Sequence, residues 1–107
     1  SWNGGAAIVA LISFTMNNPK INFNERIKKS KKLFSYALKV SGGNDLGPYV
    51  TYAESVSMAN QNRDEFIQLL RSALKIDIKA NKDLVLTNII SKNRAKWLLE
   101  SIDEFFY

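Results

Sequence analysis

The chain has 107 residues, of which 46% are hydrophobic and 23% are charged, and its formal net charge is +5. This length suits one domain, and this composition is typical of a folded globular protein and excludes a disordered chain. The sequence contains no cysteine and no histidine, which excludes thiol catalysis, Cys/His metal sites and imidazole acid–base chemistry.

The first predicted helix runs from Trp2 to Met16 and is apolar on nearly all faces. We expect such a helix to be enclosed by other helices. Asn17-Asn18-Pro19 should end it, because proline disfavours a helical residue before it. The apolar run Ala6–Ile12 is too short for a membrane span, and no signal peptide is visible. Since the first residue is Ser1, we expect a processed chain or part of a longer protein.

The second predicted helix, Asn24 to Val40, is amphipathic, with Asn24 as its N-cap and glycine in a left-handed conformation at its end. Basic residues concentrate here: Arg26 and five lysines stand against Glu25 alone. Such a face could bind nucleic acid or anionic lipid. No aromatic residues interleave with the lysines, so a solvated helix face is favoured and no nucleic-acid partner is expected.

The third and fourth predicted helices form the clearest helical hairpin. The loop 42–47 leads to Pro48, which suits the first turn of a helix that extends to about Ala59. The fourth helix runs from about Arg63 to Ile76, with Asn62 as a plausible N-cap.

A sequence repeat relates the second and fourth helices. The segments Phe34–Val40 and Leu70–Ile76 share a pattern centred on Ala37 and Ala73, which are 36 residues apart. A small residue at this position lets a neighbouring helix approach closely, and the period is near that of tetratricopeptide-type repeats.

The last segment, Lys82 to Phe106, follows a linker over Asp77–Asn81 and has apolar residues at helical spacing. It is predicted to form one helix, or two helices with a bend near Ser91. No stretch alternates with period two for long enough to form a strand. The predicted fold class is therefore all-α, with antiparallel helical hairpins stacked as a single tetratricopeptide-like repeat domain over residues 1–107.

Polar residues give no catalytic pattern. Glu54, Asp64, Glu65 and Asp77 are not paired with each other or with a nucleophile, and capping or surface roles explain them. The glycine-rich Ser41–Gly47 follows a helix and lacks the lysine–threonine ending of a phosphate-binding loop. We expect no enzymatic activity, no cofactor and no metal.

Aromatic residues are the best candidates for binding. Tyr49 and Tyr52 lie on the third predicted helix and Trp97 on the last, and we predict that these three contact a ligand or a partner. Most other aromatic side chains are expected in the core. The terminal Phe-Phe-Tyr of residues 105–107 should pack against the domain or lie at an interface.

Four blocks of the chain carry specific motifs, among them Gly47-Pro-Tyr-Val-x-x-Ala-Glu-Ser-Val-Ser57 and Arg94-Ala-x-Trp-Leu-Leu99. The blocks are Ala37–Gly43, Gly47–Ser57, Gln61–Asp77 and Asn88–Leu99. In order and spacing they resemble the T-component lipoproteins of tripartite ATP-independent periplasmic (TRAP) transporters, the TatT family.

The resemblance implies a bacterial periplasmic lipoprotein built from tetratricopeptide-like helical pairs and anchored through an N-terminal lipidated cysteine. It implies an extracytoplasmic accessory subunit that binds a TRAP substrate-binding protein, assembles as a homotrimer and handles an organic-acid or hydrophobic ligand. It also implies that a further helical pair of the family is missing near residues 19–22. The alternative is a cytoplasmic tetratricopeptide-type adaptor that binds a peptide or protein partner through its basic face.

Overall fold

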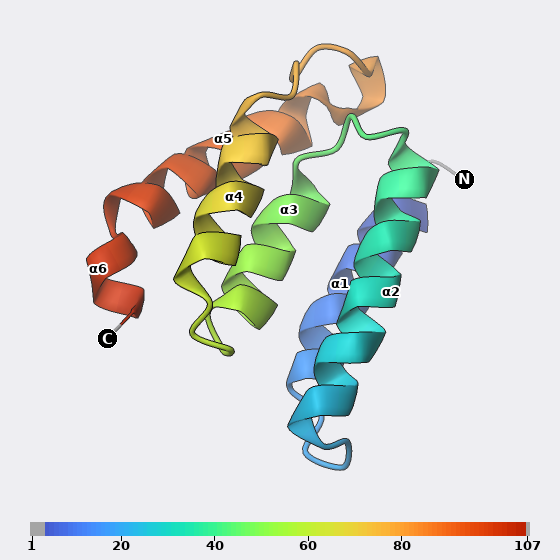
Figure 1. The fold of residues 1–107 in the computed structure, drawn as a ribbon. Coiled ribbons are helices and arrows are strands. Elements are labelled where there is room, and N and C mark those ends of the chain that lie inside the picture. The colour runs from blue at the N-terminus through green and yellow to red at the C-terminus, as the bar shows by residue number, and fades with distance from the viewer. Residues whose placement is uncertain (1–3, 107) are drawn as a thin grey trace.

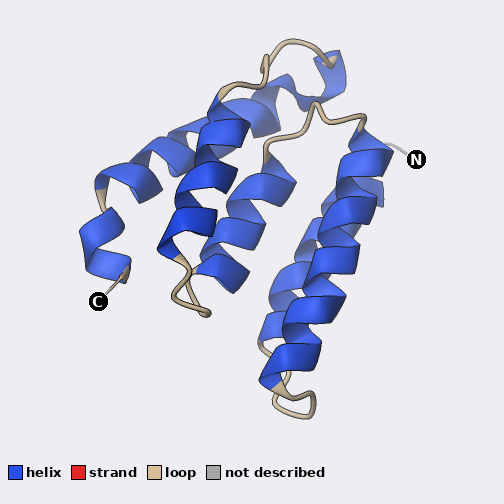
Figure 2. Ribbon diagram, in the orientation of Figure 1, coloured by secondary structure: helices blue, strands red, loops and turns tan. Residues whose placement is uncertain are grey.

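The computed structural model describes residues 4–106, with side chains described from Ala7 onward. Within this range every regular element is a helix, which confirms the all-α prediction (Figure 1 and Figure 2). The Cα trace measures 38 × 31 × 16 Å. Because one helix with its side chains is about 10 Å wide, the helices form a flat arrangement roughly two layers deep. The tetratricopeptide-like stacking of hairpins stays a prediction.

The first two helices, α1 (Gly4–Met16) and α2 (Phe23–Ser41), form an antiparallel pair joined by a short turn (Figure 1). The N-cap of α2 is Asn22, whose side-chain oxygen accepts a hydrogen bond from the backbone N–H of Glu25 over 2.9 Å. The prediction of Asn24 as the cap was wrong, because Asn24 already lies inside the helix.

Only one side of α1 is buried. Ile12 and Met16 belong to the core, whereas Leu11 is exposed and Phe14 is 72% exposed. The expectation that α1 is enclosed on all sides was therefore wrong. An apolar composition favours burial, but the neighbours in the described chain, α2 and the helices after it, cover one face of α1 only.

The middle of the fold contains α3 (Gly47–Tyr52), a π-helical turn η1 (Ala53–Ser57) and α4 (Arg63–Leu74). Pro48 stands in the first turn of α3, and Asn62 caps α4, as predicted. The α3–η1 segment packs against α1 on one side and against α4 on the other. It therefore connects the two halves of the fold.

The C-terminal part contains the 3-10 turn η2 (Lys82–Leu84), α5 (Val85–Glu100) and α6 (Ile102–Phe105). The predicted bend near Ser91 was wrong, since α5 is continuous there and the break lies at Ser101. The break turns the chain end back toward the core.

Two groups of buried side chains form the core. The larger group lies among α3, α4 and α5, and the smaller one consists of Ile12, Met16, Tyr52 and Val56. The rings of Phe105 and Phe106 pack against Phe66, with centroid distances of 6.2 and 5.0 Å. These contacts agree with the expectation that the terminal aromatic residues pack against the domain. Trp2 and Tyr107 lie outside the described residues.

Candidate functional site

An aromatic cluster brings together two of the three predicted binding residues. The ring of Phe34 on α2 meets Tyr49 edge-on at a centroid distance of 5.5 Å and Tyr52 at 5.0 Å. Tyr49 and Tyr52 are three residues apart, so they lie on the same side of α3. Such ring pairs fix side-chain orientation and contribute about 1 kcal/mol each beyond their buried area.

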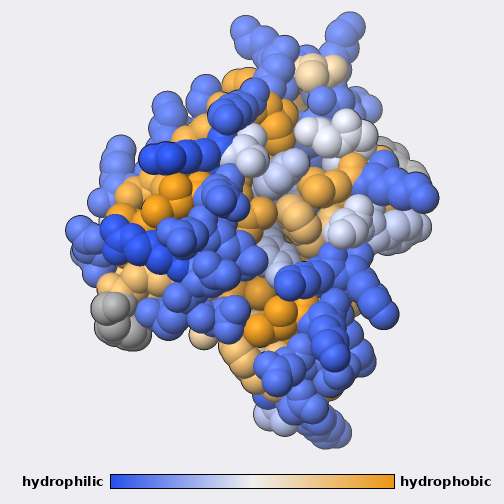
Figure 3. Space-filling view, viewed as in Figure 1, coloured by the Kyte–Doolittle hydropathy of each residue, from blue (hydrophilic) through white to orange (hydrophobic). Residues whose placement is uncertain are grey.

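A pocket of about 240 Å³ opens beside this cluster, between α2 on one side and α3 and α4 on the other. Its lining side chains are Lys31, Phe34, Ser35, Tyr52, Glu65 and Leu69. We call it the Tyr52 pocket. Tyr49 does not line this pocket, but its ring contacts Phe34, which does. On the face drawn in Figure 3, hydrophilic side chains cover much of the surface and hydrophobic residues show between them.

The hydroxyl of Tyr52 is the most unusual group in the pocket. The side chain is only 3% exposed, and its buried oxygen has no hydrogen-bond partner. An unpaired buried hydroxyl costs roughly 1–3 kcal/mol, so such groups need an explanation. Burial, and to a lesser extent the negative charge of Glu65, raise the pKa of Tyr52 to about 12. Like any tyrosine, the phenol is protonated at neutral pH, and it can donate a hydrogen bond to a ligand.

Glu65, which also lines the pocket, is held in place by two hydrogen bonds. The hydroxyl of Ser57 donates to Oε1 of Glu65 over 2.8 Å, and the Glu65 backbone N–H is capped by Asn62 over 3.1 Å. The carboxylate thus has a defined orientation from the start of α4. Its second oxygen accepts no hydrogen bond from any described residue.

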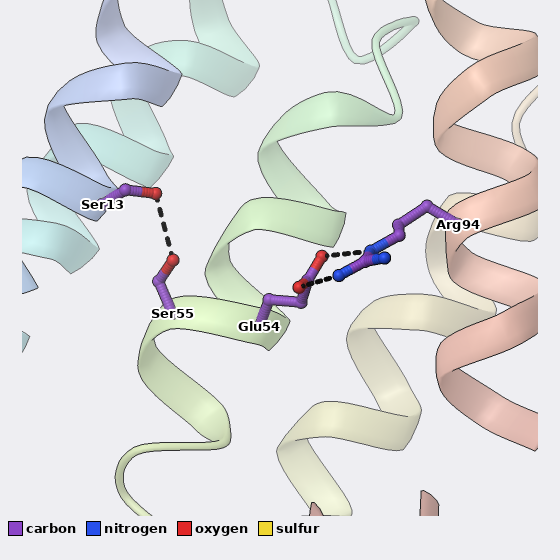
Figure 4. A network of polar contacts seen from close by, with 4 residues as sticks. All are labelled: Ser13, Glu54, Ser55 and Arg94. Carbon is purple, nitrogen blue, oxygen red and sulfur yellow. Dashed lines mark hydrogen bonds and ion pairs between the residues drawn. The ribbon is translucent and has the colours of Figure 1, made fainter. Parts of the chain in front are cut away.

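The π-helical turn η1 explains how the segment after Tyr52 reaches three neighbours. The Met58 N–H bonds the Ala53 carbonyl over 3.0 Å, five residues back, which widens the helix at this point. Glu54 points toward α5, Ser55 toward α1 and, as described above, Ser57 toward α4. Figure 4 shows the first two contacts, with the Ser55 hydroxyl 3.1 Å from that of Ser13.

The third predicted residue, Trp97, occupies a separate surface. It is 45% exposed, packs edge-on against Phe105 at 5.6 Å and lies under the guanidinium of Arg94 at 4.7 Å. Leu86 and Ile90 are exposed on the same helix at spacings that place them in line with Trp97. We call Leu86, Ile90 and Trp97 the α5 face. In the described part of the chain Trp97 shares no ring contact with Tyr49 or Tyr52.

Of the six residues that line the Tyr52 pocket, the sequence analysis identified only Tyr52 as a binding residue. It placed Phe34 in the core and Lys31 among the solvated lysines of α2, whose side chains are indeed exposed. Glu65 was explained by a capping or surface role, which does not account for its place in the pocket lining. The available signal was the spacing of Lys31, Phe34 and Ser35, which puts a charge, an aromatic ring and a hydroxyl on one helix face.

Other site types find no support among residues 4–106. These residues hold no cluster of carboxylates that could bind a metal ion. None of their helices has both the length and the apolar character needed to cross a membrane. Glu54, one of the carboxylates considered above, is paired with Arg94.

Comparison with known proteins gives a family. The family model described as TRAP transporter T-component matches residues 1–106. A protein of Treponema pallidum (strain Nichols), described as an uncharacterized protein, is 28% identical over 106 residues, which is 99% of this chain and 32% of that protein. The chain therefore spans about a third of the length of this relative.

Proposed function

The chain belongs to the TRAP transporter T-component family, and from this premise we propose that it binds a small ligand in the Tyr52 pocket and a TRAP substrate-binding protein through the α5 face. Membership in this family points to an accessory component of a TRAP transport system, and this is not a known enzyme family. It favours this role over that of a cytoplasmic peptide adaptor.

The observation that carries the ligand part is the unpartnered Tyr52 hydroxyl at the wall of an open pocket. A buried donor without a partner is stabilised when a ligand supplies an acceptor. Ligand sites combine apolar walls with a few placed polar groups, and the Tyr52 pocket has this composition. Tyr49 contributes indirectly by holding Phe34.

The partner part is supported by the α5 face. Exposed tryptophan and arginine side chains are enriched at positions that dominate binding energy in protein interfaces. Here Arg94 is already fixed against Trp97 by its pairing with Glu54, so little side-chain freedom is lost on docking.

The remaining features implied by the family resemblance belong to the same proposal. They are a periplasmic location, a lipid anchor, assembly as a homotrimer, tetratricopeptide-like stacking and the absence, near residues 19–22, of a further helical pair that the family has. The exposed side of α1 leaves room for such a helical pair to pack against it.

Native mass spectrometry of the full-length protein, with and without the substrate-binding protein of its transporter, tests the partner part. We expect a defined complex, and Ile90→Asp on the α5 face should abolish it. Phe14→Asp on α1 is the matched control, because Phe14 is 72% exposed and Ile90 62%. Loss of the complex with Phe14→Asp alone would place the docking surface on α1.

The same spectra test the ligand part. A small organic molecule that co-purifies with the wild-type protein should be lost from Tyr52→Phe. Tyr36→Phe, an exposed tyrosine of α2, is the control. A bound molecule that is retained equally by both variants would show that the pocket is not its site.

A further inference from the structure

We propose that the ligand of the Tyr52 pocket is a small zwitterion, an α-amino acid with an apolar side chain, and not a simple carboxylic acid. Because the assignment takes this pocket as the ligand site, it rests on the proposed function. It follows from the charges that the pocket presents on its two sides.

The α2 side of the pocket is basic. Lys31 and Ser35 are four residues apart, so they lie on one face of the helix and both line the pocket. An ammonium and a hydroxyl in this arrangement can both donate to a carboxylate.

The opposite side is acidic. Glu65 offers one carboxylate oxygen that accepts no hydrogen bond from the described residues, and the phenol oxygen of Tyr52 is buried and unpartnered beside it. Both side chains line the same pocket. A ligand ammonium beside Glu65 would donate to the carboxylate, while the phenol of Tyr52 donates its proton to the carboxylate of the same ligand.

The positive charge of Lys31 and the negative charge of Glu65 balance each other, and this balance favours a ligand that carries one charge of each sign. A ligand with only a carboxylate would pair with Lys31 but would face the charge of Glu65 across a pocket of about 240 Å³. A ligand with only an ammonium would leave Lys31 without a partner. A zwitterion satisfies both sides, and the rings and methyl groups of Phe34 and Leu69 cover an apolar side chain.

Three probes with the same branched hydrocarbon tail separate these cases. They are leucine, 4-methylpentanoate, which lacks the ammonium, and 3-methylbutylamine, which lacks the carboxylate. Titration calorimetry on the purified full-length protein measures each affinity. We expect leucine to bind about tenfold or more tightly than either other probe, because each removes a charge-assisted hydrogen-bonded pair.

Charge-neutral variants assign each end of the ligand. Glu65→Gln keeps the acceptor for Ser57 but loses the charge, so it should weaken leucine about tenfold and leave 4-methylpentanoate unchanged or bound more tightly. Lys31→Gln should weaken leucine and 4-methylpentanoate but not the amine. Lys32→Gln, an exposed lysine outside the lining, should change none of the three.

Equal affinity for leucine and 4-methylpentanoate, or insensitivity of leucine binding to Glu65→Gln, would overturn the zwitterion assignment. The ligand part of the proposed function would survive that result, since a monoacid would then occupy the pocket. Absence of binding by all three probes would also overturn the assignment. The complex with the substrate-binding protein is measured separately, so its outcome is independent of these titrations.

Discussion

The guanidinium of Arg94 donates to both carboxylate oxygens of Glu54, over 2.8 and 2.6 Å, and so joins α5 to the π-helical turn η1. The hydrogen bond to Glu54 also raises the pKa of Arg94 above its ordinary value. Both side chains are partly exposed, at 48% and 30%, so solvent screens the pair. Its contribution to stability is therefore about 1 kcal/mol or less, and its main effect is to position the Trp97 surface.

Arg94→Ala should change the environment of Trp97 more than it changes stability. We expect a loss of about 1 kcal/mol in the free energy of unfolding and a shift in Trp97 fluorescence, because the ring loses the covering cation. The emission is measured in a Trp2→Phe background, which leaves Trp97 as the only tryptophan. Arg63→Ala, which breaks the exposed ion pair with Asp103, should alter neither property. An identical emission spectrum with and without Arg94 would contradict the contact.

Asn88 should be among the least replaceable polar residues. It is fully buried, accepts the N–H of Leu46 over 3.0 Å and donates to the carbonyl of Asn44 over 2.9 Å. Asn88→Ala leaves both backbone groups unsatisfied and should lower the free energy of unfolding by about 2 kcal/mol or more. Asn88→Asp keeps the acceptor but loses the donor, and should also destabilise. Urea denaturation followed by circular dichroism measures the effect, with exposed Asn93→Ala as control.

Gly42 ends α2 at a φ of +66°, where its N–H bonds the carbonyls of the last turn. A β-carbon there would meet only the Asn44 side chain at 4.0 Å, so the cost of substitution comes from the backbone and not from crowding. Gly42→Ala should lower the free energy of unfolding by about 1 kcal/mol. Gly42→Asn should cost less, because asparagine tolerates the left-handed region. Equal losses for both variants would show that another factor limits this site.

Local chemistry explains which features could be predicted from the sequence. Pro48, Asn62 and Gly42 act within one turn of the backbone, and each stands where the sequence indicated. Asn22 and Asn24 are both good caps, so composition could not choose between them. The break at Ser101 and not at Ser91 depends on the packing of the chain end against Phe66, a tertiary contact.

The candidate site was predictable only in part for the same reason. Tyr49 and Tyr52 were identified as aromatic residues on one helix, and both adjoin Phe34. The pocket that Tyr52 shares with Lys31 and Glu65 needs three helices to meet, and no periodicity within one helix encodes that meeting. Trp97 was predicted to bind together with the two tyrosines, but it lies on a different surface, because the sequence does not show which helix faces which.

Stability at alkaline pH should depend on Tyr52. Its pKa is about 12 in the folded protein against an ordinary value of 10, so between these values the folded state binds more protons than the unfolded state. The free energy of unfolding therefore falls as pH rises through this window, by about 2 kcal/mol near its upper end, and is unaffected by this group below it. Tyr52→Phe has no titrating hydroxyl and should lack this part of the loss.

Urea denaturation of the wild type and of Tyr52→Phe at about pH 9 and at about pH 11.5 measures the difference. Lysine deprotonation affects both proteins alike, so only the difference between their pH-induced losses reports on Tyr52. At the lower pH Tyr52→Phe should be at least as stable as the wild type, because it removes an unpartnered buried hydroxyl. Tyr36→Phe should follow the wild type at both values. Parallel losses in the wild type and Tyr52→Phe would mean that the Tyr52 hydroxyl is hydrated and not buried.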